Sequence, residues 1–217
     1  MWSRILTIIT LLPAALSALV LHEYAHGLVA DRLGDPTPRA AGRLTLNPLR
    51  HLDPVGTLML LVAHIGWARP VPIDPQYFEN PRAGMVSVSL AGPLANMAGA
   101  LSFGLVLRFV PAQILAMSSP PWSVLTSFLL WGMVINLVLA AFNLLPLPPL
   151  DGSKVLQGLL PARAASAYGW LGRLGPLPLL VLVVAGRSLL WKTIGPFVRY
   201  FGCLFAGQEI VQLLNLG

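Results

Sequence analysis

The feature that most constrains this fold is an apolar run, Ile5 to Ala30, that carries three ionisable side chains. The run is almost wholly apolar up to Leu21, and at about 1.5 Å per residue the whole segment is long enough, as a helix, to cross a bilayer. His22, Glu23 and His26 stand near its end. Ionisable groups are costly at membrane depth, so their presence inside a predicted span indicates a functional site.

The spacing of these groups suggests metal chemistry. His22 and His26 are four residues apart and share one helix face, where two imidazoles can bind one metal ion. Glu23 lies about a quarter-turn away, within reach of a metal-bound water molecule as general base. The segment HEYAH therefore fits the HExxH pattern of zinc proteases. The alternative is a pair of interfacial histidines beside an unrelated glutamate.

Composition supports a membrane protein. Hydrophobic residues make up 56% of the 217 residues and charged residues only 10%, which is outside the range of ordinary soluble domains. We therefore expect a single polytopic membrane domain over residues 1–217. The net charge of +6 does not indicate nucleic acid, because the basic residues are scattered singly through loops. The single Cys203 excludes an internal disulfide and a cysteine-rich metal site.

The apolar segments predict an all-α fold with three long transmembrane helices. Two segments follow the first one, at about residues 83–110 and 122–145. Between the first and second spans, the apolar run Val55 to Gly66 would extend only about 18 Å as a helix, so it predicts a re-entrant segment.

The connections and the C-terminal part complete this architecture. Residues 42–47 alternate in polarity and residues 67–75 hold three prolines, so both predict short extended, β-like stretches. A further apolar segment near 174–190 and the tail from Phe197 predict one or two additional C-terminal helices. We thus expect a catalytic core at about residues 5–160 and C-terminal helices at about 170–217.

A catalytic zinc normally takes three protein ligands, so a third ligand is needed. Asp31 follows His26 too closely for good geometry, and Asp53 and Asp74 adjoin prolines as cap and turn residues. Asp151 ends a proline-bounded loop after the third span and precedes Gly152; its local sequence fits a turn as well as a ligand. The full set of candidates with carboxylate oxygens is Asp31, Asp35, Asp53, Asp74, Glu79, Asp151 and Glu209.

Topology favours Asp151. If Val55 to Gly66 is re-entrant, the third span returns to the side where the first one ends, and Asp151 arrives beside the histidines. The opposite side would have Arg4 and Arg108. By the positive-inside rule, the histidine side faces the cytoplasm of a multi-pass protein of the cell membrane. That side would carry Arg32, Arg39, Arg43, Arg50, Arg69, Arg82, Lys154, Arg163 and Arg173.

Six segments together resemble the site-2 protease family, the intramembrane zinc metalloproteases of peptidase family M50, in a compact prokaryotic form. They occur in the family's order over residues 5 to about 160. The segments are HEYAH (22–26), GRLTLNP (42–48), HLDPVGT (51–57), GWARPVPIDP (66–75), AGPLAN (91–96) and NLLPLPPLDG (143–152).

The resemblance implies one Zn²⁺ per chain, bound by His22, His26 and Asp151, with Glu23 as the catalytic base. It also implies that Asn96 and Asn143 lie near the cleft and help to hold substrate or the developing oxyanion; interhelical hydrogen bonding is the alternative for both asparagines.

The activity implied by the resemblance is hydrolysis of peptide bonds within or near transmembrane segments. The partners are then a transmembrane protein or peptide substrate and membrane lipid, and no nucleic acid. A metal transporter or a catalytically silent metal-binding scaffold is the alternative function.

Overall fold

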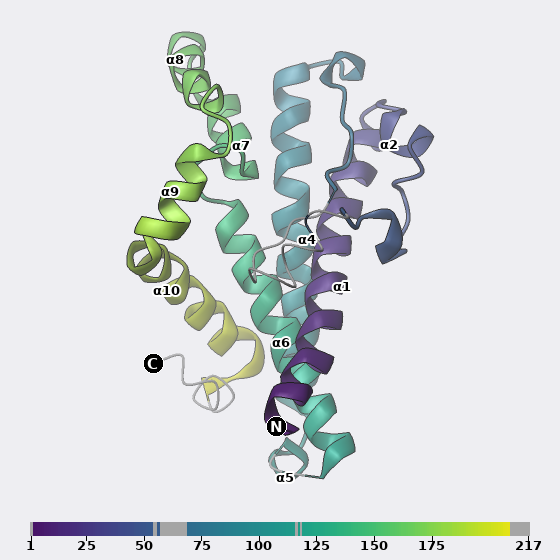
Figure 1. Ribbon diagram of the computed structural model, residues 1–217. Helices are drawn as coiled ribbons and strands as arrows, with labels where there is room; N and C mark the ends of the chain where they lie inside the picture. Colours follow the sequence, from purple (N-terminus) through teal and green to yellow (C-terminus); the bar gives the residue numbers. More distant parts are fainter. Residues whose placement is uncertain (1, 54–55, 57–68, 116, 118, 209–217) are drawn as a thin grey trace.

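Three long apolar helices form the body of the protein (Figure 1). The computed structural model describes residues 2–53, 56, 69–115, 117 and 119–208. The helices are α1 (Trp2–Arg32), α4 (Pro81–Phe109) and α6 (Pro120–Asn143). Each contains a stretch that is long and apolar enough to cross a membrane. The prediction of an all-α fold with three long spans is therefore confirmed.

Local sequence sets the ends of these helices. The side chain of Asn80 accepts a hydrogen bond from the amide of Ala83, and Pro81 occupies the first helical position of α4. Pro13 and Pro93 lie inside α1 and α4. Proline is tolerated inside membrane helices, where neighbouring helices can satisfy the freed backbone groups.

The main apolar core lies where α10 (Arg187–Ala206) packs against α4 and α6. This core combines side chains from three separated stretches of sequence, and α10 therefore covers one side of the bundle. The buried members include Leu107 of α4, Met133 and Leu137 of α6, and Ile194 and Val198 of α10.

The end of α1 and the start of α4 lie at the same end of the bundle, where a buried carboxylate joins the two connections. Asp35 is fully buried. Its Oδ1 accepts hydrogen bonds from the amide and the hydroxyl of Thr37, and its Oδ2 accepts one of 2.7 Å from the amide of Asp74. Asp74 in turn caps the 3₁₀ turn η2 (Pro75–Tyr77) through Gln76, as expected of a turn residue.

The other connections are mainly irregular. A short helix α2 (Thr37–Ala40) and a 3₁₀ turn η1 (Pro48–Arg50) follow α1. Residues 42–47 form turns and bends, and residues 69–74 run without helical structure. Apart from a single bridge residue, Leu52, no β-structure occurs in the part of the chain that the structure describes. The predicted re-entrant segment, Val55 to Gly66, lies outside the described residues except for Gly56.

The C-terminal part contains more and shorter helices than expected. α7 (Asp151–Leu159) and α8 (Ala162–Gly172) are followed by α9 (Leu177–Ala185) and then α10. α8 and α9 meet at 69° and together have the apolar length of a further span. Gly175 with φ 59° and then Pro176 interrupt the helix, because neither continues a regular right-handed helix.

Candidate metal centre

Three buried side chains from two distant helices converge on one point. His22 and His26 come from α1, and Asp151 is the first residue of α7; their exposed fractions are 5%, 6% and 7%. The two Nε2 atoms are 2.9 Å apart, and each lies 3.1 Å from Oδ2 of Asp151. The structure thus brings together the three residues that the sequence predicts as metal ligands.

The other nitrogen of each ring fixes its tautomer. His22 Nδ1 lies 2.7 Å from Oδ1 of Asn96, and His26 Nδ1 lies 2.7 Å from the carbonyl oxygen of Val88. Because both partners are acceptors, each Nδ1 carries the proton, and each neutral ring directs the Nε2 lone pair inward. The amide orientation of Asn96 is set by Ala18, whose carbonyl accepts from its Nδ2 at 2.9 Å.

The donor set fits zinc. Two imidazole nitrogens and one carboxylate oxygen are a common set for a catalytic zinc ion, which keeps its fourth position open. Ligand atoms about 2.0–2.1 Å from a tetrahedral ion are separated by about 3.3 Å, so the observed triangle needs to expand by only a few tenths of an ångström. Three inward lone pairs at such short separations favour a cation between them.

The net electrostatic environment keeps Asp151 ionised, the form that binds metals. Burial alone would raise its pKa, but the hydrogen bonds that His22 and His26 donate when their rings are protonated, together with nearby positive charge, shift the pKa well below its usual range. The ammonium group of Lys154 contributes to that charge and lies 3.5 Å from Oδ1 of Asp151. The other carboxylate oxygen, Oδ2, is therefore directed at the histidines.

Two glycines permit this close packing. A Cβ atom at Gly92 of α4 would lie 2.5 Å from Nε2 of His26 and 2.6 Å from Cε1 of His22. A Cβ atom at Gly152 would lie 2.2 Å from the carbonyl oxygen of Leu144. Side chains at either position would therefore push α4 off the imidazoles or α7 away from the end of α6.

Glu23 lines the same cleft, a cavity of about 170 Å³. It is half-buried, and its Oε2 accepts a hydrogen bond of 3.1 Å from the amide of Val71. The irregular segment that holds Val71 forms one wall of the cleft through Pro70 and Ile73, and Pro149 contributes to the lining from another connection.

The two predicted asparagines take different places. Asn143 lines the cleft, and its Nδ2 donates to the carbonyl of Leu139 on its own helix. Asn96 is fully buried, outside the cleft lining, and its amide group bonds to His22, Ala18 and Asn136. Its position thus matches an interhelical and ring-orienting role more closely than contact with substrate.

Asn136 was not anticipated from the sequence. It is buried in α6, where its Oδ1 accepts from Asn96 and its Nδ2 donates to the carbonyl of Gly132. A lone amide in the middle of an apolar span is a recognisable signal, because an unsatisfied polar group there is costly.

The chain resembles proteins of one known family. The model of the family described as Peptidase family M50 matches residues 110–168, which include Asn143 and Asp151. A Bacillus subtilis (strain 168) protein named "Putative zinc metalloprotease YwhC" is 40% identical over 191 residues, covering 85% of this chain and 87% of its own. No solved structure matches.

Two further relatives carry the same description. Rip2 of Mycolicibacterium smegmatis is 34% identical over 183 residues, which cover 81% of this chain and 67% of that protein. MJ0611 of Methanocaldococcus jannaschii is 34% identical over 155 residues, which cover 70% and 72%. With such identity over most of its length, and with its histidines and aspartate gathered at one point, this chain belongs to peptidase family M50, the site-2 protease family of zinc metalloproteases.

Proposed function

We propose that this protein is an intramembrane endopeptidase that hydrolyses peptide bonds within or near transmembrane segments of membrane proteins. The observation that carries the proposal is the shared cleft: three inward metal-ligand atoms and the carboxylate of Glu23 line one small cavity, and the histidines and Glu23 belong to a helix long and apolar enough to span a membrane.

In this proposal His22, His26 and Asp151 hold one zinc ion. Zinc bound there supplies a Lewis acid that polarises a peptide carbonyl and acidifies water. The protein's part is to keep the ligands fixed: Asn96 and Val88 hold the two rings, and the first turn of α7 holds the carboxylate.

Glu23 acts as the general base. Its carboxylate takes a proton from the attacking water as the new C–O bond forms, and it then returns that proton to the leaving amine as the C–N bond breaks. The amide of Val71 holds Oε2 of Glu23 and thereby restrains the carboxylate over the cleft.

Substrate must reach this cleft in an extended form. The carbonyls of a transmembrane helix are engaged in internal hydrogen bonds, so a substrate helix unwinds locally before attack. Asn143 lies on the lining of the cleft and has amide hydrogen-bonding capacity beyond its bond to Leu139; we assign it to the unwound backbone or the developing oxyanion.

We place the site toward the cytoplasmic side of the cell membrane. Most of the basic residues lie in the connections and short helices at the histidine end; Arg108 lies at the opposite end of α4, and Arg187, Lys192 and Arg199 belong to α10. The positive-inside rule then orients α1, α4 and α6.

The test compares purified wild type with Asp151→Ala and Glu23→Gln, measuring zinc per chain and cleavage of a transmembrane peptide. Asp151→Ala should lose most zinc and all cleavage. Glu23→Gln should keep its zinc and lose 10²- to 10⁴-fold or more in rate, because an amide cannot take up the proton. Glu79→Gln, which changes an exposed acid outside the cleft, is the matched control.

Near-normal turnover by a folded Glu23→Gln protein would exclude this mechanism. A transporter or a silent scaffold would bind zinc in the wild type without cleaving any peptide.

A further inference from the structure

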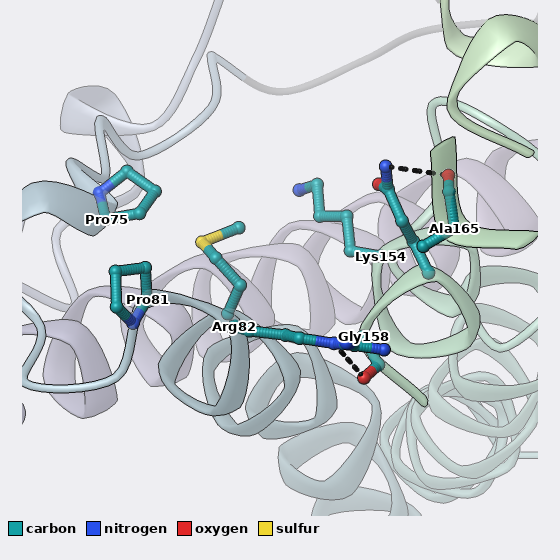
Figure 2. Close-up of a pocket in the computed structure, with 8 residues that line it drawn as sticks. Pro75, Pro81, Arg82, Lys154, Gly158 and Ala165 are labelled. Atoms are coloured by element: carbon teal, nitrogen blue, oxygen red, sulfur yellow. Dashed lines mark hydrogen bonds between the residues drawn. The ribbon is translucent and has the colours of Figure 1, made fainter. Parts of the chain in front are cut away.

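A second, larger cavity lies beside the metal cleft. It has a volume of about 400 Å³, within the range of ligand-binding pockets. Pro75 and Pro81 stand on one side, while Lys154, Gly158 and Ala165 stand on the other (Figure 2). The cavity is thus bordered by η2 and the start of α4 on one side and by α7 and α8 on the other.

Lys154 connects the two cavities. It lines both the metal cleft and the larger cavity, and its ammonium lies 3.5 Å from Oδ1 of Asp151. Oδ2 of the same carboxylate is 3.1 Å from Nε2 of each histidine. An extended chain advances about 3.3 Å per residue, so the larger cavity begins within about two residues of a peptide bond held at the metal centre.

The polar groups of this cavity are largely engaged with the protein itself. The guanidinium of Arg82 donates to the carbonyl of Gly158 at 2.7 Å and also to that of Leu160, which ties α4 to the end of α7. The side-chain amide of Gln157 contacts the carbonyl of Ala165 at 3.5 Å. What remains for an occupant is an apolar surface.

The apolar lining comes from Pro75, Pro81, Met85 and Ala165. Met85 offers a flexible thioether that adapts to side chains of different shape. A strongly apolar side chain fits such a wall. A carboxylate would lose its hydration, and both cations of the lining already have partners: Arg82 donates to the carbonyls of Gly158 and Leu160, and Lys154 pairs with Asp151.

We propose that this cavity is a specificity subsite, which takes one large apolar side chain, such as Leu, Met or Phe, of the unwound substrate within about two residues of the scissile bond. The inference rests on the proposed peptidase function and adds to it a preference that the metal centre alone does not provide. Transmembrane segments supply such side chains at nearly every position.

The first test changes the volume of the cavity. Ala165→Leu reduces it and Met85→Ala enlarges it, while Ala164→Leu, at an exposed neighbouring position, and Met97→Ala, which packs in the main core, are matched controls. Cleavage is measured with transmembrane peptides that carry Ala, Leu, Phe or Trp at each position near the scissile bond.

At one substrate position, Ala165→Leu should lower the ratio of kcat/KM for Phe over Ala by about 10-fold or more, and Met85→Ala should raise the ratio for Trp over Leu. Zinc content should not change in either variant. The controls should keep the wild-type preference.

The second test locates the substrate without turnover. In a protein with Glu23→Gln and Cys203→Ser, Ala165→Cys should form a disulfide with a single cysteine placed at that same substrate position, and Ala164→Cys should not. Absence of cleavage by the zinc-loaded wild type would overturn the peptidase function and this subsite together. Cleavage with unchanged preferences in both cavity variants, or cross-linking equal at all substrate positions, would overturn the subsite alone.

Discussion

The side-chain oxygen of Asn96 lies 2.7 Å from Nδ1 of His22, and this contact links the metal centre to the middle of the bundle. The amide nitrogen of Asn96 donates at 2.9 Å to the carbonyl of Ala18 and at 2.9 Å to Oδ1 of Asn136. One polar chain therefore runs from α6 through α4 to a histidine on α1. Each member is buried, so each bond is costly to break.

We predict that Asn96→Ala weakens zinc binding by about 10- to 100-fold, because His22 loses the acceptor that fixes its ring. The measurement is a titration of zinc against a competing chelator. Asn143→Ala is the comparison, since Asn143 lines the cleft without bonding to either histidine; it should reduce cleavage while zinc affinity stays near wild type. Equal zinc affinity in Asn96→Ala and wild type would contradict this role.

A second prediction concerns Gly92. The Cβ of Gly92→Ala would lie 2.5 Å from Nε2 of His26, so α4 must shift or the ring must rotate away from the site. The variant should lose most of its zinc. Gly172→Ala is the control, because a Cβ there meets no atom within 4 Å. Zinc per chain, measured after purification, should fall for Gly92→Ala only; full occupancy in that variant would show that the packing can relax.

Much of the architecture was predictable from the sequence, because a helix that spans a membrane requires a long apolar run. The boundaries expected at 83–110 and 122–145 differ by one or two residues from those of α4 and α6. The C-terminal region was harder, since the apolar run near 174–190 is divided by Gly186 between α9 and α10. Hydropathy does not record such a break.

The candidate site, too, was predictable from the sequence only in part. His22 and His26 are four residues apart on one helix, and this local spacing was enough to predict that their side chains lie on the same face. Asp151 is 125 residues from His26, so its placement depended on counting crossings rather than on its own neighbours. Asn136 was overlooked because its role arises only from contact with Asn96 on another helix.

A third prediction tests the buried carboxylate that joins the connections. Asp35→Ala would leave the amides of Thr37 and Asp74 without their partner, at a cost of about 1–3 kcal/mol for each buried group. We expect a clearly lower Tm in detergent and a raised KM, because Asp74 lies in the same segment as Val71, which contacts Glu23. Asp74→Ala removes only the side-chain cap of η2 and keeps the backbone amide that donates to Asp35, so it should lower the free energy of unfolding by only about 1 kcal/mol. Similar Tm values for Asp35→Ala and wild type would refute this assignment.

The last prediction concerns the segment Val55 to Gly66, which we expect not to cross the membrane. As a helix it would extend about 18 Å, against about 30 Å of hydrocarbon. On either side of it, the loop after α1 and the segment before α4 are joined by the 2.7 Å bond between Asp35 and Asp74. A full crossing would have to be followed by a return before residue 74.

Labelling in sealed cells tests this topology and the orientation of the site separately. In a Cys203→Ser background, single cysteines replace Leu46 and Gln76, exposed residues that lie before and after the segment, and Gln113, an exposed residue of α5 (Ala112–Leu115). A membrane-impermeant thiol reagent should label Gln113→Cys and leave the other two unlabelled, because a cytoplasmic position is out of its reach. Different outcomes for Leu46→Cys and Gln76→Cys would mean that the segment crosses. Labelling of both, with protection of Gln113→Cys, would preserve the re-entrant arrangement and place the metal centre on the outer side instead.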